Sequence, residues 1–428
     1  MKMKKVLALV LVVAVIAVLS ISLIACGGKT TTTNANEIQI PEYSGTIPAN
    51  FKFGLITLHD DASTYDKNFI DAAYAAAEMI GLPKDRVIIR SGVEEGEDCT
   101  TVANELVQQG CKVIMADSFG HESYLKAAAL QHTDVQFCHA TGTNAINYNL
   151  DNFHNAFASI YEGRYLAGVA AGMKLNKMIE AGKFTADQAK IGYVGAYTYA
   201  EVISGLTSFY LGVKSECPTV KMDVRFTGSW YDPTAEKEAA EALIQDGCKL
   251  ISQHADSMGA PSACEAAGIP NVSYNGSTIE ACPNTFIVSS RIDWAPYMAY
   301  IMIHTIEGTP IDDNYVGSLL DGSVKLTALN GDVVDITVAK KLAKVRDELI
   351  LGTRKVFDTS TFTVGGAAMT TFKAALETDE NYNPTKLSDE VIITDAITGI
   401  TYFAESYVRS APYFDKTIDG ITFKNTEI

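Results

Sequence analysis

The chain is short of basic side chains. Its 428 residues carry 34 lysines and arginines against 51 aspartates and glutamates, a formal net charge of −17. Lys2, Lys4 and Lys5 precede a long apolar run, and loss of this N-terminal segment would change the charge to −20. Nucleic-acid binding needs a basic surface that neutralises phosphates. The composition therefore argues against a nucleic-acid partner and favours a monomer with an acidic surface.

The sequence also lacks the common catalytic and metal-binding motifs. HExxH, the P-loop, GxSxG, GxGxxG and the EF-hand loop are all missing. The seven histidines are scattered without the spacing of metal ligands. No set of nucleophile, base and orienting group can be assembled from these motifs. We therefore expect no catalytic residue, no metal ligand and no cofactor, and an enzyme is the weakest functional hypothesis.

Cysteine is present, but no CxxC occurs. If Cys26 carries a lipid, seven of the eight cysteines are left, and an odd number cannot fully pair into disulfides. Cys111 and Cys248 each begin a predicted strand and read as small core residues. Cys264 and Cys282 could form a disulfide. We expect mostly free, buried thiols.

The N-terminus reads as a targeting segment. A basic start, MKMKK, precedes an apolar run over residues 6–25, and the run ends in Leu23-Ile24-Ala25-Cys26. These four residues resemble a bacterial lipobox, in which Cys26 is diacylated after residues 1–25 are removed. A permanent transmembrane anchor is the alternative. Residues 26–50, rich in Thr, Asn and Gly, are expected to tether the protein to the outer face of the cell membrane.

Two stretches about 140 residues apart nearly repeat each other. Residues 105–120 read ELVQQGCKVIMADSFG, and residues 242–259 read ALIQDGCKLISQHADSMG. Each is the end of a helix, a glycine stop, a short apolar strand and a polar loop. Chance similarity between two generic units is the alternative, but the match includes a cysteine, a lysine and the loop. The repeat predicts two similar lobes.

Helices and strands alternate over most of the chain. A strand at residues 51–61 and a helix at 65–80 begin this alternation, and a second start follows at residues 189–197. The pattern predicts an α/β fold with two doubly wound, Rossmann-like lobes joined by a hinge. The strand at residues 285–294 is expected to cross back to the first lobe. The tail is expected to add a last strand and helix to the second lobe from residue 361 onward.

The predicted organisation follows from these patterns. Residues 51–155 with about 292–325 form the first lobe, and about 156–291 with about 326–428 form the second.

Loops at the carboxyl ends of the predicted strands are where such lobes bind small molecules. Trp230, one of two tryptophans, precedes a turn that opens a helix, and it is expected to stack on a ligand. Aromatic faces beside hydrogen-bonding groups suit a flat, polar heterocycle. Asp117 and Asp256 could equally be helix N-caps, and His59 and His254 could equally make structural hydrogen bonds. The other candidates are Asp60, Asp61, Tyr65, Asp66, Ser118, Phe119, Asn149, Tyr231 and Asn275.

Several segments together resemble the basic membrane protein family, which comprises lipoprotein substrate-binding components of ABC transporters typified by purine nucleoside receptors. The resemblance spans about residues 51–329, and the EGRYLAG and WYDPxxEKE segments are fairly specific. The matching segments are DKNF (66–69), SFG (118–120), HATG (139–142), YEGRYLAGVAAG (161–172), KIGYVGAY (190–197), GSWYDPTAEKEAAEALIQDG (228–247), QHADS (253–257) and SSRIDWAPY (289–297).

The resemblance implies a type I periplasmic-binding-protein fold, no enzymatic activity, a purine nucleoside or nucleobase ligand, and ABC permease and ATPase partners. By position, Trp230 would stack on the base, Asp66 would lie in the ribose-side loop, and Asp256 would face the crevice. Arg291 falls where the receptors tend to have a lysine near the hinge. The predicted ligand-binding residues are thus Tyr65, Asp66, Ser118, Phe119, Trp230, Asp256, Asn275 and Arg291.

The sequence departs from the nucleoside receptors at two strand ends. Those receptors usually have an aspartate where this chain has HATG (139–142), and GxDxD-like residues where it has YNGS (274–277). The variants resemble a subgroup that would prefer a free nucleobase such as adenine. A sugar receptor of the same fold, and a sensory module that passes its closed form to a signalling partner, stay open as alternatives.

Overall fold

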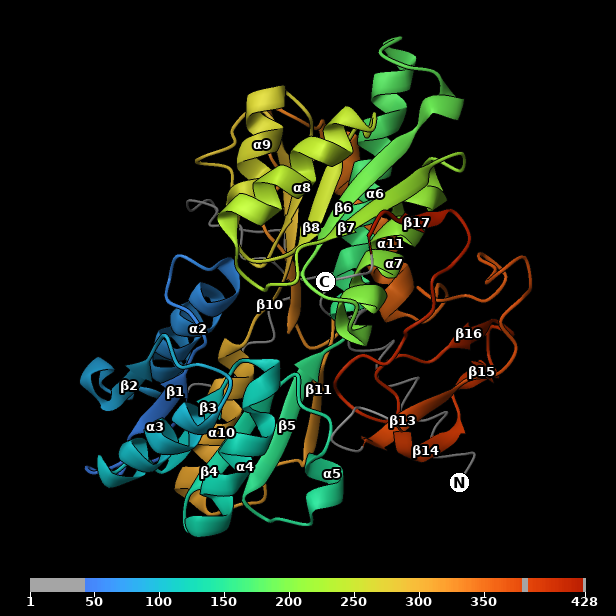
Figure 1. Ribbon diagram of the computed structural model, residues 1–428. Coiled ribbons are helices and arrows are strands. Elements are labelled where there is room, and N and C mark those ends of the chain that lie inside the picture. The colour runs from blue at the N-terminus through green and yellow to red at the C-terminus, as the bar shows by residue number, and fades with distance from the viewer. Residues whose placement is uncertain (1–42, 379–383, 426–428) are drawn as a thin grey trace, which may run out of the picture. The chain divides into compact units, whose positions relative to one another are not determined.

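The computed structural model describes residues 43–378 and 384–425. The predicted signal peptide, Cys26 and most of the predicted tether lie outside these ranges. The described residues belong to one compact unit, residues 38–428. Its two large sheets are mainly parallel, and each is covered by helices on both faces (Figure 1).

The first sheet has the strand order β11-β5-β4-β3-β1-β2, and all its pairings are parallel. Its strands are β1 (Phe53–Ile56), β2 (Val87–Arg90), β3 (Val113–Ala116), β4 (Gln136–Ala140), β5 (Phe153–Ala158) and β11 (Asn314–Gly317). Alternate strand residues face opposite sides, so Phe53 and Ile114 belong to different apolar cores. One face packs against α2 (Thr64–Ile80) and α10 (Ala295–Glu307), the other against α3 (Glu97–Gln108) and α4 (Glu122–Gln131). We call this sheet and its helices the first lobe.

The second sheet has the order β12-β10-β9-β8-β6-β7-β17, and only β12 is antiparallel to its neighbour. Its strands are β6 (Lys190–Gly195), β7 (Lys221–Phe226), β8 (Ile251–His254), β9 (Asn271–Tyr274), β10 (Phe286–Ile292), β12 (Val324–Leu326) and β17 (Ile421–Phe423). The covering helices are α6 (Ile160–Glu180) and α7 (Ala200–Glu216) on one face, and α8 (Pro233–Gln245) and α9 (Gly259–Ala267) on the other. We call this the second lobe.

The repeated segments occupy equivalent places. The order β4-β3-β1-β2 in the first lobe corresponds to β9-β8-β6-β7 in the second, and the two repeats contain β3 and β8. Cys111 and Cys248 are buried just before these strands. All seven cysteines of the described part are free and buried, as predicted, so Cys264 and Cys282 do not form a disulfide here.

Local capping explains where the helices that carry site residues begin. Ser63 caps α2 by accepting a hydrogen bond from the amide of Asp66 (3.2 Å). Asp232 caps α8 by accepting from the amides of Thr234 (3.0 Å) and Ala235 (2.9 Å), and Pro233 occupies the first turn. These caps fix the loops that follow β1 and β7.

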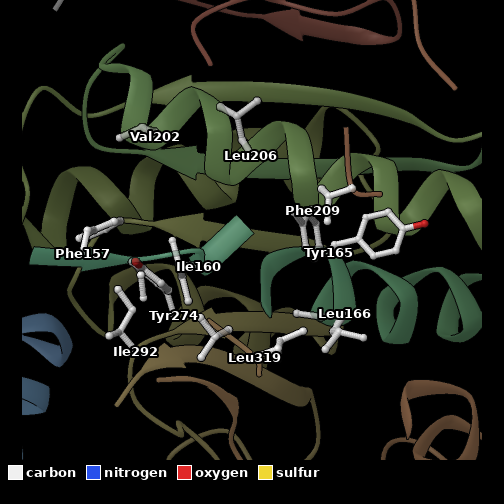
Figure 2. Close-up of a cluster of buried hydrophobic side chains, with 14 of the residues drawn as sticks. Phe157, Ile160, Tyr165, Leu166, Val202, Leu206, Phe209, Tyr274, Ile292 and Leu319 are labelled. Atoms are coloured by element: carbon white, nitrogen blue, oxygen red, sulfur yellow. The ribbon is translucent and has the colours of Figure 1, made fainter. Parts of the chain in front are cut away.

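One strand prediction was wrong in part. The strand expected to cross back to the first lobe is β10, and it stays in the second sheet because it pairs with β9 and β12. The chain crosses only after it, into α10, which packs on α2. The other crossings follow β5 and β11. Figure 2 shows Phe157, Ile160, Ile292 and Leu319, which flank these crossings, in one apolar cluster with residues of α6 and α7. The predicted limits of the lobes stay a prediction.

Residues 359–378 and 384–425, here called the C-terminal segment, lie after α11 (Ile336–Ile350). They form the pairs β13 (Lys373–Thr378) with β14 (Pro384–Glu390) and β15 (Ile392–Thr394) with β16 (Thr401–Phe403), and end in β17. The predicted last strand is therefore β17. The helix predicted after residue 361 was wrong, because the described residues beyond 361 contain none; the last helix of the described part is α11, which ends at Ile350.

Helices α6 and α7 approach so closely that glycine is required where they meet. A Cβ atom built on Gly168 would lie 2.1 Å from the carbonyl oxygen of Phe209, and one on Gly212 would lie 2.1 Å from that of Tyr165. Such contacts can be relieved only by separating the helices. Because these helices cover one face of the second sheet, their spacing affects the whole lobe.

We predict that Gly168→Ala lowers the free energy of unfolding by about 1–3 kcal/mol, the usual cost of overpacking a core. Urea denaturation measures it. Gly331→Ala is the matched control, because no atom lies within 4 Å of a Cβ there. Equal stability of the two variants would show that the helix contact adapts freely.

Candidate ligand-binding site

A small cavity with a free volume of about 20 Å³ lies between the two lobes, at the carboxyl ends of the parallel strands. This is about the space that one water molecule needs, so a larger ligand enters only when the lobes move apart. Six of the eight predicted ligand-binding residues line it, from both lobes. The lining residues are Leu58, His59, Tyr65, Asp66, Ser118, Phe119, Thr141, Glu201, Trp230, His254, Asp256 and Tyr274.

The lobes touch each other beside this cavity. The amide of Thr64 in the first lobe donates to the carbonyl oxygen of Asp256 in the second (2.9 Å). The rings of His59 and Tyr231 lie 5.4 Å apart between centroids. Phe119 of the first lobe stacks on Tyr199 of the second at 5.4 Å. The structure is therefore a closed arrangement of the two lobes.

Asp66 is held by its own loop. Its carboxylate accepts hydrogen bonds from the amide of His59 (2.7 Å) and the hydroxyl of Ser63 (2.5 Å), and the His59 ring lies 3.5 Å away. Burial opposes ionisation, but the hydrogen bonds from His59 and Ser63 outweigh it and lower the pKa of Asp66. Asp66 thus lines the cavity as an ionised group that also orders the β1–α2 loop.

Tyr65 and Asp117 join the strand-end loops of the first lobe. The Tyr65 hydroxyl donates to the carbonyl oxygen of Asp117 (2.8 Å), and the amide of Leu58 donates to Asp117 Oδ1 (3.2 Å). Oδ2 is buried and has no partner among the described residues. Burial, and then the charge of Asp66, raise the pKa of Asp117 well above its usual value, so the ionised form of this carboxyl is disfavoured. The N-cap alternative is wrong, because Ser118 precedes the short helical turn instead.

Asp256 offers acceptors from the second lobe. Its side chain is 4 % exposed, and no described residue forms a hydrogen bond with its carboxyl oxygens. Burial raises its pKa well above the usual value, the carboxylates of Asp66, Glu236 and Glu201 add to the rise, and Arg164 opposes it. Asp256 is not an N-cap either, since Met258 precedes α9.

A buried polar cluster lies behind Asp256. Glu201, near the start of α7, approaches the ring of His254 at 3.5 Å. The guanidinium of Arg164 donates to the carbonyl oxygen of Gln253 (2.8 Å) and lies 3.4 Å from the ring centroid of Tyr274. Arg164 Nε and Nη2, and the Tyr274 hydroxyl, have no hydrogen-bond partner in the described structure. The cavity floor therefore has unused hydrogen-bonding capacity.

Aromatic rings form another part of the lining. The rings of Trp230 and Tyr197 lie 5.1 Å apart at an interplanar angle of 68°, and those of Trp230 and His254 lie 6.5 Å apart. Trp230 is only partly buried, so part of its ring is accessible from the cavity. Such a wall can bind the face of a flat ligand.

Equivalent glutamates hold the two ADS loops. Glu95 accepts from the Ser118 hydroxyl (2.5 Å) and from the amide of Gly120 (2.7 Å). In the second lobe, Glu236 accepts from the amide of Ser257 (3.2 Å). Ser118 therefore lines the cavity with its hydroxyl hydrogen already donated.

Thr141 introduces backbone strain at the cavity. Its φ of 67° lies in the left-handed region, which a β-branched residue rarely adopts, and its buried hydroxyl has no partner in the described part. The neighbouring Gly142 is required there, because a Cβ on it would lie 2.1 Å from Nδ2 of the Asn155 side chain. This strained turn is the HATG segment, where an aspartate is usual in the receptors that the chain resembles.

The comparisons with known proteins agree with this geometry. The family described as ABC transporter substrate-binding protein PnrA-like matches residues 53–358. The chain belongs to this family. It is 32 % identical over 292 residues to a purine-binding protein of Brucella abortus, a match that covers 68 % of this chain and 75 % of the relative.

Two further comparisons give a second relative and a solved structure of the same fold. A protein of Haloferax volcanii named for glucose binding in an ABC transporter is 29 % identical over 265 residues, 61 % of this chain and 64 % of that one. A solute-binding protein of an ABC transporter from Aeropyrum pernix has the same fold, with a TM-score of 0.60 and 16 % identity over 72 % of this chain and 93 % of that chain.

The predicted two-lobed, type I periplasmic-binding-protein fold is thus confirmed. The PnrA-like chain is a substrate-binding protein, not an enzyme, and solute-binding proteins of ABC importers act on the extracytoplasmic side. Across residues 43–378 and 384–425, no helix has the length and apolarity needed to span a bilayer. The same residues contain no cluster of three metal-ligating side chains.

Two predicted residues of the PnrA-like chain do not line the cavity. Asn275, with φ 62°, follows β9 and has a buried side-chain amide with no partner among the described residues. Arg291 lies on β10, is 36 % exposed, and approaches Asp293 at 3.7 Å. The lining residues that sequence reasoning passed over are Leu58, Thr141, Glu201 and Tyr274. Glu201 could have been found, because it follows the strand at residues 190–195, and binding residues gather at such strand ends.

We predict that Glu201 makes stability fall as pH rises. Burial, partly offset by Arg164, raises the pKa of Glu201 from 4.5 to about 7. Between these values the folded protein holds a proton that the unfolded chain has released, so the free energy of unfolding decreases with pH. Between pH 4.5 and pH 7.5, the free energy of unfolding of Glu201→Gln should therefore decrease by about 1–3 kcal/mol less than that of the wild-type protein. Urea denaturation across this pH range measures the difference.

The exposed Glu238 in the same lobe provides the control for Glu201. Glu238→Gln should keep the pH dependence of the wild-type protein. If Glu201→Gln also keeps it, the Glu201 carboxyl does not hold a proton in the folded state.

Proposed function

We propose that the chain is the lipid-anchored receptor of an ABC importer and that it captures a purine nucleobase or nucleoside between its lobes. The observation that carries this proposal is the pairing of an aromatic wall at Trp230 with the acceptor-rich group of Asp256 and Glu201 in one closed cavity. The edge of a purine presents both donors and acceptors, and its faces stack on aromatic rings. The purine-binding relative from Brucella abortus supports the same ligand class.

The charged groups around the cavity restrict the class of the proposed ligand further. Asp66, Glu201 and Asp256 line it, and Asp117 lies next to Tyr65, whereas Arg164 is buried against the ring of Tyr274. An anionic ligand such as a nucleotide would meet these carboxyl groups. We therefore propose an uncharged ligand rich in hydrogen-bond donors, with a free nucleobase or a nucleoside as the candidates.

The proposed anchor and partners rest on other features. Cys26 ends the lipobox-like sequence, and diacylation there would hold a monomeric receptor at the outer face of the membrane. An ABC permease and its ATPase would receive the ligand, as the family implies. We predict that Cys26→Ala moves the protein from the membrane fraction to the medium or periplasm, as followed by immunoblotting of cell fractions. Retention of this variant in the membrane would contradict lipid anchoring.

A sugar receptor is the second candidate. The Haloferax volcanii relative named for glucose binding favours it. Sugar sites also combine an aromatic face with carboxylates, so the cavity chemistry is compatible with both ligands.

Calorimetry with the purified mature protein separates the two candidates. We predict that at least one of adenine, adenosine, guanosine and inosine binds and that glucose does not. The reason is that the Trp230 ring can cover a planar base. Binding of glucose without any purine would replace the purine proposal with the sugar receptor.

The same titration on Trp230→Ala should show a loss of affinity of about 10- to 100-fold, since stacking of a base on an aromatic ring is worth about 1–3 kcal/mol. Trp230→Phe keeps an aromatic face and is the matched control, with a smaller loss. Unchanged purine affinity in Trp230→Ala would show that the base lies elsewhere in the cavity.

A further inference from the structure

The C-terminal segment lies outside residues 53–358, which the family match covers. Its end is built into the second lobe, where β17 pairs in parallel with β7. Asn425 reinforces this edge, because its side chain donates to the carbonyl oxygen of Phe226 and accepts from the amide of the same residue, both at 2.9 Å. The segment therefore has a firm attachment to the second lobe.

A buried glutamate and an aromatic core add to this attachment. Glu405, 5 % exposed, accepts from the Ser204 hydroxyl on α7 (2.7 Å) and from the amides of Tyr413 (2.6 Å) and Phe414 (3.2 Å). Phe414 stacks on Phe357 at 4.8 Å. These contacts order the segment and hold it against α7.

The same segment also reaches the first lobe, but by a few polar contacts. The Asn147 side chain, on the short helix α5 (Ala145–Tyr148), donates to the carbonyl oxygen of Leu376 (2.6 Å) and accepts from Lys386 Nζ (3.2 Å). Asn314, the first residue of β11, accepts from the amide of Ser410 (2.7 Å). The segment therefore bridges the two lobes in the closed arrangement.

We propose that the C-terminal segment is a latch that stays on the second lobe and reversibly binds the first lobe through Asn147 and Asn314. The asymmetry of its contacts supports this role, because sheet pairing and a buried core are harder to break than partly exposed hydrogen bonds. When the lobes separate and the amide of Thr64 leaves Asp256, the hydrogen bonds of the segment with Asn147 and Asn314 break, while its contacts with the second lobe stay. The latch thus favours the closed state and slows exchange of the ligand. The effect on ligand exchange rests on the proposed function, whereas the effect on closure of the lobes does not.

Amide hydrogen exchange on the ligand-free mature protein tests the latch. The Thr64 amide is protected by Asp256 of the other lobe, so its exchange reports opening of the cleft, while the Ser410 amide reports release of the latch. In the double variant Asn147→Ala with Asn314→Ala, we expect the protection of both amides to fall about tenfold, given the loss of three hydrogen bonds. Amides in the buried strands β3 and β6 should keep their protection.

Thr394→Ala is the matched control, because the Thr394 hydroxyl bonds only with that of Thr401 (2.8 Å), within the segment and on its exposed side. This control should leave the protection of the Thr64 amide from exchange unchanged. The proposal is overturned if, in the double variant, the Ser410 amide loses protection from exchange while the Thr64 amide does not. It is also overturned if Thr394→Ala lowers the protection of the Thr64 amide as much as the double variant does. Should the double variant lose protection in β3, the single variants Asn147→Ala and Asn314→Ala are compared in the same way. Because no ligand is added, the result is independent of whether a purine binds.

Discussion

Parallel strand pairing in both sheets determines where the ligand cavity lies and which loops can line it. Strands β1, β3 and β4 in one lobe, and β6, β8 and β9 in the other, run parallel to their neighbours. Their carboxyl ends must then lie along one edge of each sheet, and the two edges face each other. Residues far apart in the sequence, such as Tyr65 and Trp230, meet in one cavity for this reason.

Closing two such edges buries carboxyl groups, and the protein accommodates them in different ways. Asp66 keeps its charge because its own loop supplies hydrogen-bond donors. Asp117 and Asp256 have few donors nearby, so burial raises their pKa values. Burial in the closed cleft thus disfavours the ionised forms of Asp117 and Asp256, and a donor-rich molecule bound there would favour them again. The C-terminal segment adds contacts to this closed state from outside the cleft.

Sequence reasoning predicted much of this arrangement because strand ends can be recognised from their flanking patterns. The repeated ADS loops led to the equivalent strands β3 and β8, and six residues chosen from strand ends line the cavity. Arg291 does not, because a position within a strand, unlike one in the loop after it, can face away from the cleft. The strain at Thr141 was not visible either, since HATG gives no signal of a left-handed backbone.

The class of fold, the duplication and the edge on which a site would form are predictable from the amino-acid pattern, because they follow from local periodicity and turn residues. Which side chains share the cavity depends on how distant elements pack against each other. Arg164 lies within a helix of small and apolar residues, and its contact with Tyr274 depends on how α6 packs against the second sheet. The bridge from residues 376 and 410 to Asn147 and Asn314 likewise spans more than 90 residues of chain. Contacts of this kind arise from packing between distant elements, which no local pattern encodes.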